Sequence, residues 1–91
     1  MRKFLIEREV PGAANVTAEE LQGIAEKSNA ALDEMGVPYH WVQSFVAGDK
    51  IYCVHIAEDE EAIREHARCG GFPANVVSEI IATIDPTTAS G

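Results

Sequence analysis

The sequence predicts one small α+β domain whose strands and helices follow each other in the order βαββαβ. Three observations support this prediction. Residues 3–9 and the segments on either side of Gly48-Asp49 alternate in hydrophobicity, as half-buried strands do. The segments that follow Thr17 and Asp59 repeat apolar side chains at helical spacing. A chain of 91 residues is long enough for one domain and too short for two.

The first expected strand covers residues 3–9 and ends at Pro11-Gly12, which favours a turn. Because neighbouring side chains of a strand point to opposite faces, its residues form two sets. One set is Phe4, Ile6 and Arg8, and the other is Leu5, Glu7 and Glu9. A carboxylate on a partly buried strand needs a metal, an arginine or another donor as partner, unless it lies at a solvated end.

The first expected helix begins with a capping box, in which the Thr17 hydroxyl and the Glu20 carboxylate bind free amides of the first turn. The residues of its inner stripe recur at helical spacing; they are Leu21, Ile24, Ala25, Ser28, Ala31, Leu32 and Met35. Gly36 and Pro38 end the helix, because a glycine adopts the left-handed cap and a proline cannot continue the helix.

A β-hairpin is expected next, with strands at 39–47 and 50–57 joined by the two-residue turn Gly48-Asp49. Counting outward from this turn, alternation predicts one bulky face and one with smaller or chemically reactive side chains. The bulky face is expected to meet the helices; it consists of Tyr39, Trp41, Gln43, Phe45, Tyr52, Val54 and Ile56. The second, open face consists of His40, Val42, Ser44, Val46, Ile51, Cys53, His55 and Ala57.

The second expected helix begins at Asp59, which caps it, and ends at Gly70-Gly71. Its inner stripe contains Ala62, Ile63, His66, Ala67 and Gly70. Residues 75–84 also fit helical spacing, but their β-branched side chains favour a last strand near 78–84, ended by Asp85-Pro86. We therefore expect a single domain at residues 1–86 and a mobile tail at 87–91.

The order βαββαβ with both helices on one face of a four-stranded antiparallel sheet is the ferredoxin-like arrangement. Its other sheet face has no cover within one chain. Packing two such faces together would form a dimeric α+β barrel with an internal cavity, so we predict a two-fold homodimer.

The open face of the hairpin suggests a metal site, because it brings together His40, Cys53 and His55. Glu7, from the acidic side of the first strand, could lie with them. Imidazole nitrogen and thiolate sulfur suit zinc, nickel and copper, and a carboxylate adds negative charge. The alternative is that Cys53 is a small buried apolar residue and the histidines are ordinary surface or core groups.

On the second helix His66 and Cys69 are three residues apart and can share a face. They suggest a second metal or polar site; the alternative is that His66 is a hydrogen-bonded histidine of the inner stripe. The two cysteines match no disulfide framework or CxxC motif.

The charge balance makes some partners unfavourable. The formal net charge of −8 repels phosphate backbones, so no nucleic-acid partner is expected, and it attracts cations. No segment approaches the ~18 apolar residues of a membrane span. The first residues do not form a signal peptide, because Glu7 interrupts their apolar run, and we expect a cytoplasmic protein.

Several segments together resemble a bacterial family of small proteins that was long known only as a domain of unknown function. They are Ile6-Glu7-Arg8 with Pro11-Gly12, Trp41-Val42-x-Ser44, Asp49 to Val54, Ile63 to Ala67 with Gly71 to Ala74, and Ile84 to Thr87. A member of this family is described as a nickel-binding protein with a ferredoxin-like fold that forms a dimeric α+β barrel. The resemblance covers nearly the whole chain.

The resemblance implies that this chain binds Ni²⁺, or another divalent transition metal such as Zn²⁺. Positions that match the family pattern are Glu7, Arg8, Trp41, Ser44, Cys53, Glu65 and His66. His55 stands where the pattern often has tyrosine, and His40 is outside it. We therefore predict Cys53 and His66 as the leading metal ligands, with Glu7, His55 and His40 as further candidates.

Two other functions remain open at this point. One is a cofactor-free enzyme or small-molecule-binding barrel, with His55 or His66 as general base and Arg8 or Arg64 as the group that holds an anion. The other is a dimeric interaction module without chemistry of its own.

Overall fold

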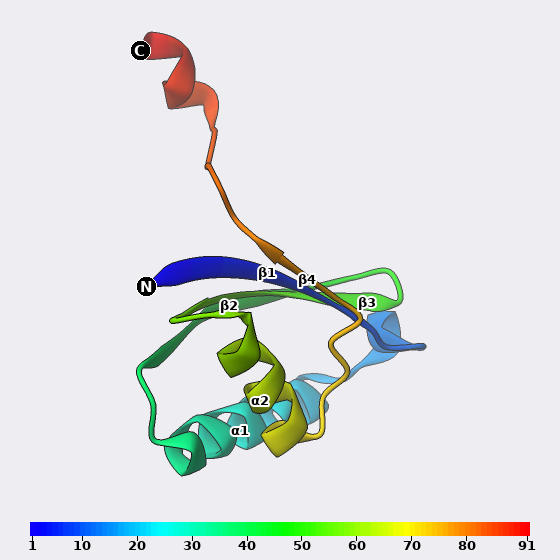
Figure 1. Ribbon diagram of the computed structural model, residues 1–91. Helices are drawn as coiled ribbons and strands as arrows, with labels where there is room; N and C mark the ends of the chain where they lie inside the picture. The colour runs from blue at the N-terminus through cyan, green and yellow to red at the C-terminus, as the bar shows by residue number, and fades with distance from the viewer.

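The computed structural model describes all 91 residues as two helices on one face of a four-stranded sheet (Figure 1). The strands are β1 (Arg2–Glu9), β2 (Tyr39–Ala47), β3 (Lys50–Ala57) and β4 (Val76–Glu79). The helices are α1 (Ala18–Met35) and α2 (Glu60–Gly70), with two short 3-10 helices at Ala13–Asn15 and Pro86–Ser90. All strand pairs are antiparallel in the order β2-β3-β1-β4, so the predicted ferredoxin-like α+β fold is confirmed.

The predicted helix ends are also confirmed. Thr17 caps α1 through a hydrogen bond that its side chain accepts from the Glu20 amide, and Asp59 caps α2 in the same way. Gly36 and Gly71 end the two helices in the left-handed conformation, with φ of 63° and 70°. Neither helix combines the length and the apolar character that a membrane-spanning helix requires.

The assignment of the hairpin faces was wrong. Ile51, Cys53, His55 and Ala57 of β3 are buried beneath the helices, whereas Tyr52, Val54 and Ile56 are on the outer face and partly exposed. Side-chain bulk is a poor guide here, because small residues such as Cys53 and Ala57 let a helix approach the sheet closely. The core continues through Phe4, Ile6, Ala13 and Ile63.

A β-bulge in β2 produces a second difference from prediction. The pairs Gln43–Val54, Ser44–Cys53 and Phe45–Tyr52 follow the predicted register, but the register shifts between Trp41 and Gln43. Trp41 therefore pairs with His55 and lies on the helix side, while His40 pairs with Ile56 on the outer face. His40 consequently does not share a face with Cys53 and His55.

The first strand has the orientation that we expected, but its acidic side does not lie with Cys53, because the faces of the hairpin are reversed. Phe4, Ile6 and Arg8 are buried on the helix side, where Ile6 pairs with Cys53 and Arg8 with Ile51. Glu7 pairs with Tyr52 and lies on the outer face. The acidic side of β1 is thus separated from Cys53 by the sheet.

The last strand is shorter and earlier than predicted. It ends at Glu79 rather than near residue 84, because only Val76–Glu79 find partners on β1. The chain then runs away from the domain and ends in the 3-10 helix Pro86–Ser90, which Asp85 caps (Figure 1).

Candidate functional site

Two side chains of the site come from β3, whose alternation directs Cys53 and His55 toward the helices. Cys53 is 5% exposed and His55 is 1% exposed. A third side chain, His66, comes from the inner stripe of α2 and is also 1% exposed. The predicted inner stripe of this helix therefore places a histidine directly above the sheet.

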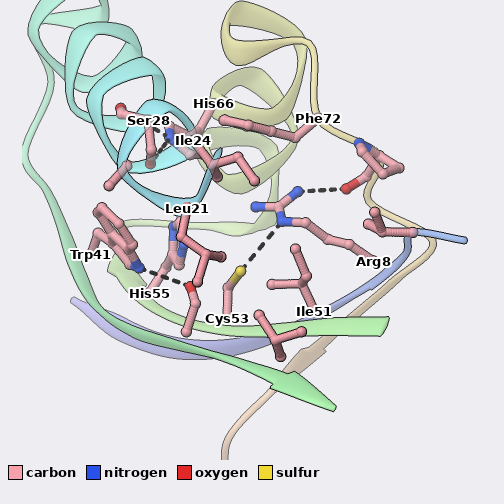
Figure 2. A pocket seen from close by; sticks show the side chains of 15 residues that line it. Arg8, Leu21, Ile24, Ser28, Trp41, Ile51, Cys53, His55, His66 and Phe72 are labelled. Atoms are coloured by element: carbon pink, nitrogen blue, oxygen red, sulfur yellow. Dashed lines mark hydrogen bonds between the residues drawn. The ribbon is translucent and has the colours of Figure 1, made fainter. Parts of the chain in front are cut away.

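These three side chains line one cavity of about 370 Å³ between the sheet and the helices. Figure 2 shows that side chains of the sheet, such as Cys53 and Arg8, and side chains of the helices, such as Leu21 and Ile24, point into the same space. Most of the lining is apolar; Trp41, Ile51 and Phe72 contribute to it as well. The cavity thus combines a large apolar wall with a few polar groups, as small-molecule and cofactor sites commonly do.

The hydrogen bonds of His66 define which of its nitrogens is free. Its Nε2 lies 3.1 Å from the Ser28 hydroxyl and 3.4 Å from the Ser28 carbonyl oxygen. Because a carbonyl can only accept, Nε2 carries the proton of the neutral ring, and Nδ1 keeps its lone pair. That Nδ1 is buried and has no hydrogen-bond partner. Such an atom is unusual in a native interior and points to an unsatisfied binding position.

His55 is held by Tyr39, whose hydroxyl lies 2.5 Å from its Nδ1. The two imidazoles face each other edge-on, with ring centroids 5.1 Å apart. Burial lowers the pKa of His55 to about 3, and the charges of His66 and Arg8 act in the same direction. Burial also lowers the pKa of His66 and raises the pKa of Tyr39. Both rings are therefore neutral near pH 7, the state in which an imidazole binds a metal.

Arg8 is the only charged side chain that is buried in the protein, with 4% exposure. Its Nε donates to Cys53 Sγ at 3.4 Å, and its Nη1 donates to the Pro73 carbonyl at 2.5 Å (Figure 2). Its guanidinium lies 5.4 Å from the centre of the Phe72 ring. It holds the loop after α2 against β1 and places a positive charge beside the thiol.

The structure separates the five predicted metal ligands into two groups. Cys53, His55 and His66 line the same cavity. Glu7 and His40 lie on the outer face of the sheet, where the Glu7 carboxylate is 3.6 Å from the Lys50 ammonium. No single ion within one chain can be bound by both groups.

The predicted pairing of His66 with Cys69 does not occur. Cys69 is exposed and lies 3.6 Å from a Glu65 carboxylate oxygen, while His66 points toward the sheet. The alternative reading of His66, a hydrogen-bonded histidine of the inner stripe, matches its contacts with Ser28.

The donor types of the cavity suit nickel or zinc, and the free Nδ1 of His66 offers one open position. The set is incomplete, however. No group of three or more His, Cys, Asp or Glu side chains in the chain is placed to hold a metal ion. Any metal in the cavity would need to complete its coordination with water or with a small rearrangement of the side chains.

Two partners of the histidines were missed by sequence reasoning. Ser28 was assigned only to the apolar stripe of the first helix, and Tyr39 was assigned to the face opposite His55. A serine on an otherwise apolar stripe is a signal of a buried polar partner. No comparable signal marks Tyr39, because its position depends on the bulge near Val42.

Comparison with known proteins agrees with the resemblance found in the sequence. Residues 4–80 match the model of a family described as "Nickel responsive protein SCO4226-like". The structure is similar to the crystal structure of SCO4226 from Streptomyces coelicolor A3(2), with a TM-score of 0.72 and 22% sequence identity. The similarity covers 90% of this chain and 99% of that chain, and at this identity it establishes a common fold.

No curated protein matches the chain. The family match spans residues 4–80, which include the hairpin, α2 and all five predicted metal ligands. The chain belongs to the nickel responsive SCO4226-like family.

Proposed function

We propose that this protein binds Ni²⁺ in the cavity between the sheet and the helices, with Cys53, His55 and His66 as donor side chains. The main support is that a thiol and two neutral imidazoles line one cavity, and that the His66 Nδ1 has a free lone pair. Thiolate and imidazole are good ligands for nickel. The description of the family as nickel responsive points to the same metal.

Binding at this site requires a change at Arg8. Its Nε donates a hydrogen bond to the Cys53 sulfur at 3.4 Å, and the positive charge of the guanidinium repels a second cation at that position. In our proposal the Cys53 sulfur loses its hydrogen bond from Arg8 and binds the metal as a thiolate. Arg8 keeps its hydrogen bond to the Pro73 carbonyl. Glu7 and His40, on the outer face, are not ligands of this ion.

Calorimetric titration of tag-free, chelator-treated protein with Ni²⁺, and in parallel with Zn²⁺, tests the proposal. We expect one Ni²⁺ per chain and a thiolate-to-nickel charge-transfer band in the near-ultraviolet spectrum. Cys53→Ser should abolish the band, and His66→Gln should weaken binding tenfold or more, about 1.4 kcal/mol.

The chain offers a matched control for each variant. Cys69→Ser changes the exposed thiol, and His40→Gln changes the exposed histidine, so neither should alter the affinity or the band. The assignment fails if Ni²⁺ binds wild type and the Cys53→Ser and His66→Gln variants equally. Nickel binding itself fails if wild type takes up no metal.

We also propose that the chain forms a homodimer through the bare face of its sheet. One support is the absence of any helix over that face (Figure 1). The other is the exposure of its apolar side chains, among them Val54 and Phe45.

A further inference from the structure

Arg8 differs from the other arginines of the chain because it has no carboxylate partner. Arg2 and Arg68 are exposed and Arg64 is partly exposed, and each pairs with a carboxylate within 3.0 Å. Arg8 is buried and forms no ion pair, although the chain has 15 acidic residues. An isolated buried charge is costly, and protein interiors normally supply a counter-charge.

The guanidinium of Arg8 has one end free. Nε is used by Cys53 and Nη1 by the Pro73 carbonyl, and neither the hydrogen bonds nor the ion pairs of the chain include Nη2. In Figure 2 this third nitrogen of Arg8 points away from the two dashed hydrogen bonds of its guanidinium, into the space that the labelled side chains surround. The donor thus faces the cavity, where a bound molecule could reach it.

The rest of the cavity indicates the chemical character of the part of such a ligand that lies away from Arg8. Its wall is predominantly apolar and includes the flat rings of Trp41 and Phe72. Arg8 is the only lysine or arginine among the residues that line it. A cavity of about 370 Å³ with apolar walls and one cation suits a small ligand that carries one negative charge and is otherwise apolar.

We propose that this cavity binds a small organic monocarboxylate, whose carboxylate pairs with Arg8 and whose apolar body packs against Trp41 and Phe72. A carboxylate can accept in parallel from the guanidinium, which gives a strong charge-assisted contact. A multiply charged phosphate is a poorer match, since it would meet one cation within a chain of net charge −8. This proposal does not rest on nickel binding.

The competing explanation is that Arg8 is purely structural: it holds the Pro73 loop and donates a hydrogen bond to the Cys53 sulfur. Under that explanation the cavity has no preference for an anion. The two explanations can be separated by comparing a carboxylate with a neutral molecule of the same shape.

The experiment titrates chelator-treated protein with phenylacetate and, separately, with phenylacetamide. Hexanoate and hexanamide form a second matched pair with a flexible body. Trp41 is the only tryptophan of the chain and lines the cavity, so its fluorescence reports binding, with amide NMR shifts as an independent readout. We expect at least one carboxylate to bind tenfold or more tighter than its amide, about 1.4 kcal/mol.

Arg8→Met should remove the preference for the carboxylate and leave any weak binding of the amide. Arg64→Met makes the same change at a partly exposed arginine that pairs with Glu60 outside the cavity, and should preserve the preference. Should Arg8→Met fail to fold, Ala25→Phe provides a second test: it keeps Arg8 but fills the cavity, so carboxylate binding should be lost.

Equal binding of acid and amide to wild type would overturn the proposal, as would a preference that survives Arg8→Met. Absence of saturable binding by both carboxylates would also overturn it. Because the titrations use chelator-treated protein without added metal, these outcomes do not depend on whether the protein binds nickel.

Discussion

At the scale of single residues, the cavity is lined by one thiol and two imidazoles that are at most 5% exposed, those of Cys53, His55 and His66. Alternation along β3 placed Cys53 and His55 together, and helical spacing placed His66 on the inner stripe of α2; both placements are confirmed. His40 was grouped with them because nothing in the sequence near Val42 signals a bulge. A bulge inserts one residue and reverses the facing of every side chain before it.

His55 makes the stability of the metal-free protein depend on pH. Its pKa is about 3 in the folded protein, against an ordinary value near 6.5, so the unfolded chain binds more protons between these pH values. The contribution of His55 to the free energy of unfolding is therefore fully present above about pH 6.5. It falls as the pH decreases, by at most about 1.4 kcal/mol per pH unit. His66, whose pKa is also lowered, acts in the same direction.

Urea unfolding of chelator-treated protein at a series of pH values between 7 and 4 measures this slope. His55→Gln removes one titrating group, so we expect a shallower slope and a lower stability at pH 7, where the bond with Tyr39 is weakened. His40→Gln, at an exposed histidine, should leave the slope unchanged. Equal slopes for wild type and His55→Gln would contradict the assignment.

At the scale of elements, the helices were predictable to their caps because cap chemistry is local. Thr17, Asp59 and the glycines that follow each helix act on their own backbone neighbours. The hairpin turn was predictable for the same reason. The face of β3 that meets the helices and the end of β4 were not, because both depend on contacts between segments that are distant in sequence.

Gly70, the last residue of α2, leaves room for the Phe72 ring that lines the cavity. A Cβ at this position would overlap the ring of Phe72, which lines the cavity and lies over Arg8. Gly70→Ala should therefore displace Phe72 and destabilise the fold by about 1–3 kcal/mol, the usual cost of overpacking. The gain in helix propensity, up to about 1 kcal/mol, offsets part of this cost.

Gly23→Ala is the matched control, because Gly23 lies within α1 and a Cβ there would meet nothing within 4 Å. It should stabilise the protein by about 0.5–1 kcal/mol. Urea unfolding of the two variants should thus give changes of opposite sign. Equal stabilisation by both substitutions would show that Phe72 is not held where the structure places it.

At the scale of the whole molecule, the two faces of the sheet have different environments. The helix side holds the core and the cavity, while the outer side has no cover within the chain (Figure 1). Phe45 and Val76 on the outer side are 50% and 44% exposed. Beyond β4, Ile81 and Ile84 are more than 80% exposed on a segment that extends from the domain. Such apolar exposure is typical of a surface that another protein covers.

A homodimer through the outer face would cover the central strands of the sheet. Val54 lies near the middle of this face, between Leu5 and Gln43 on the neighbouring strands. A stable interface buries about 1,200–2,000 Å² in total, and a lysine at its centre would bring two like charges together across the two-fold axis. Light scattering after size exclusion should give twice the chain mass of 9.8 kDa for wild type and a single chain mass for Val54→Lys.

Val37→Lys is the corresponding control, because Val37 is 47% exposed in the loop between α1 and β2, away from the outer face. It should remain dimeric. Circular dichroism of Val54→Lys should keep the wild-type helix content, since both helices pack on the opposite side of the sheet. A monomeric wild type would exclude the dimer, and a dimeric Val54→Lys with the mass of wild type would place the interface elsewhere, with the exposed segment at Ile81 and Ile84 as the next surface to test.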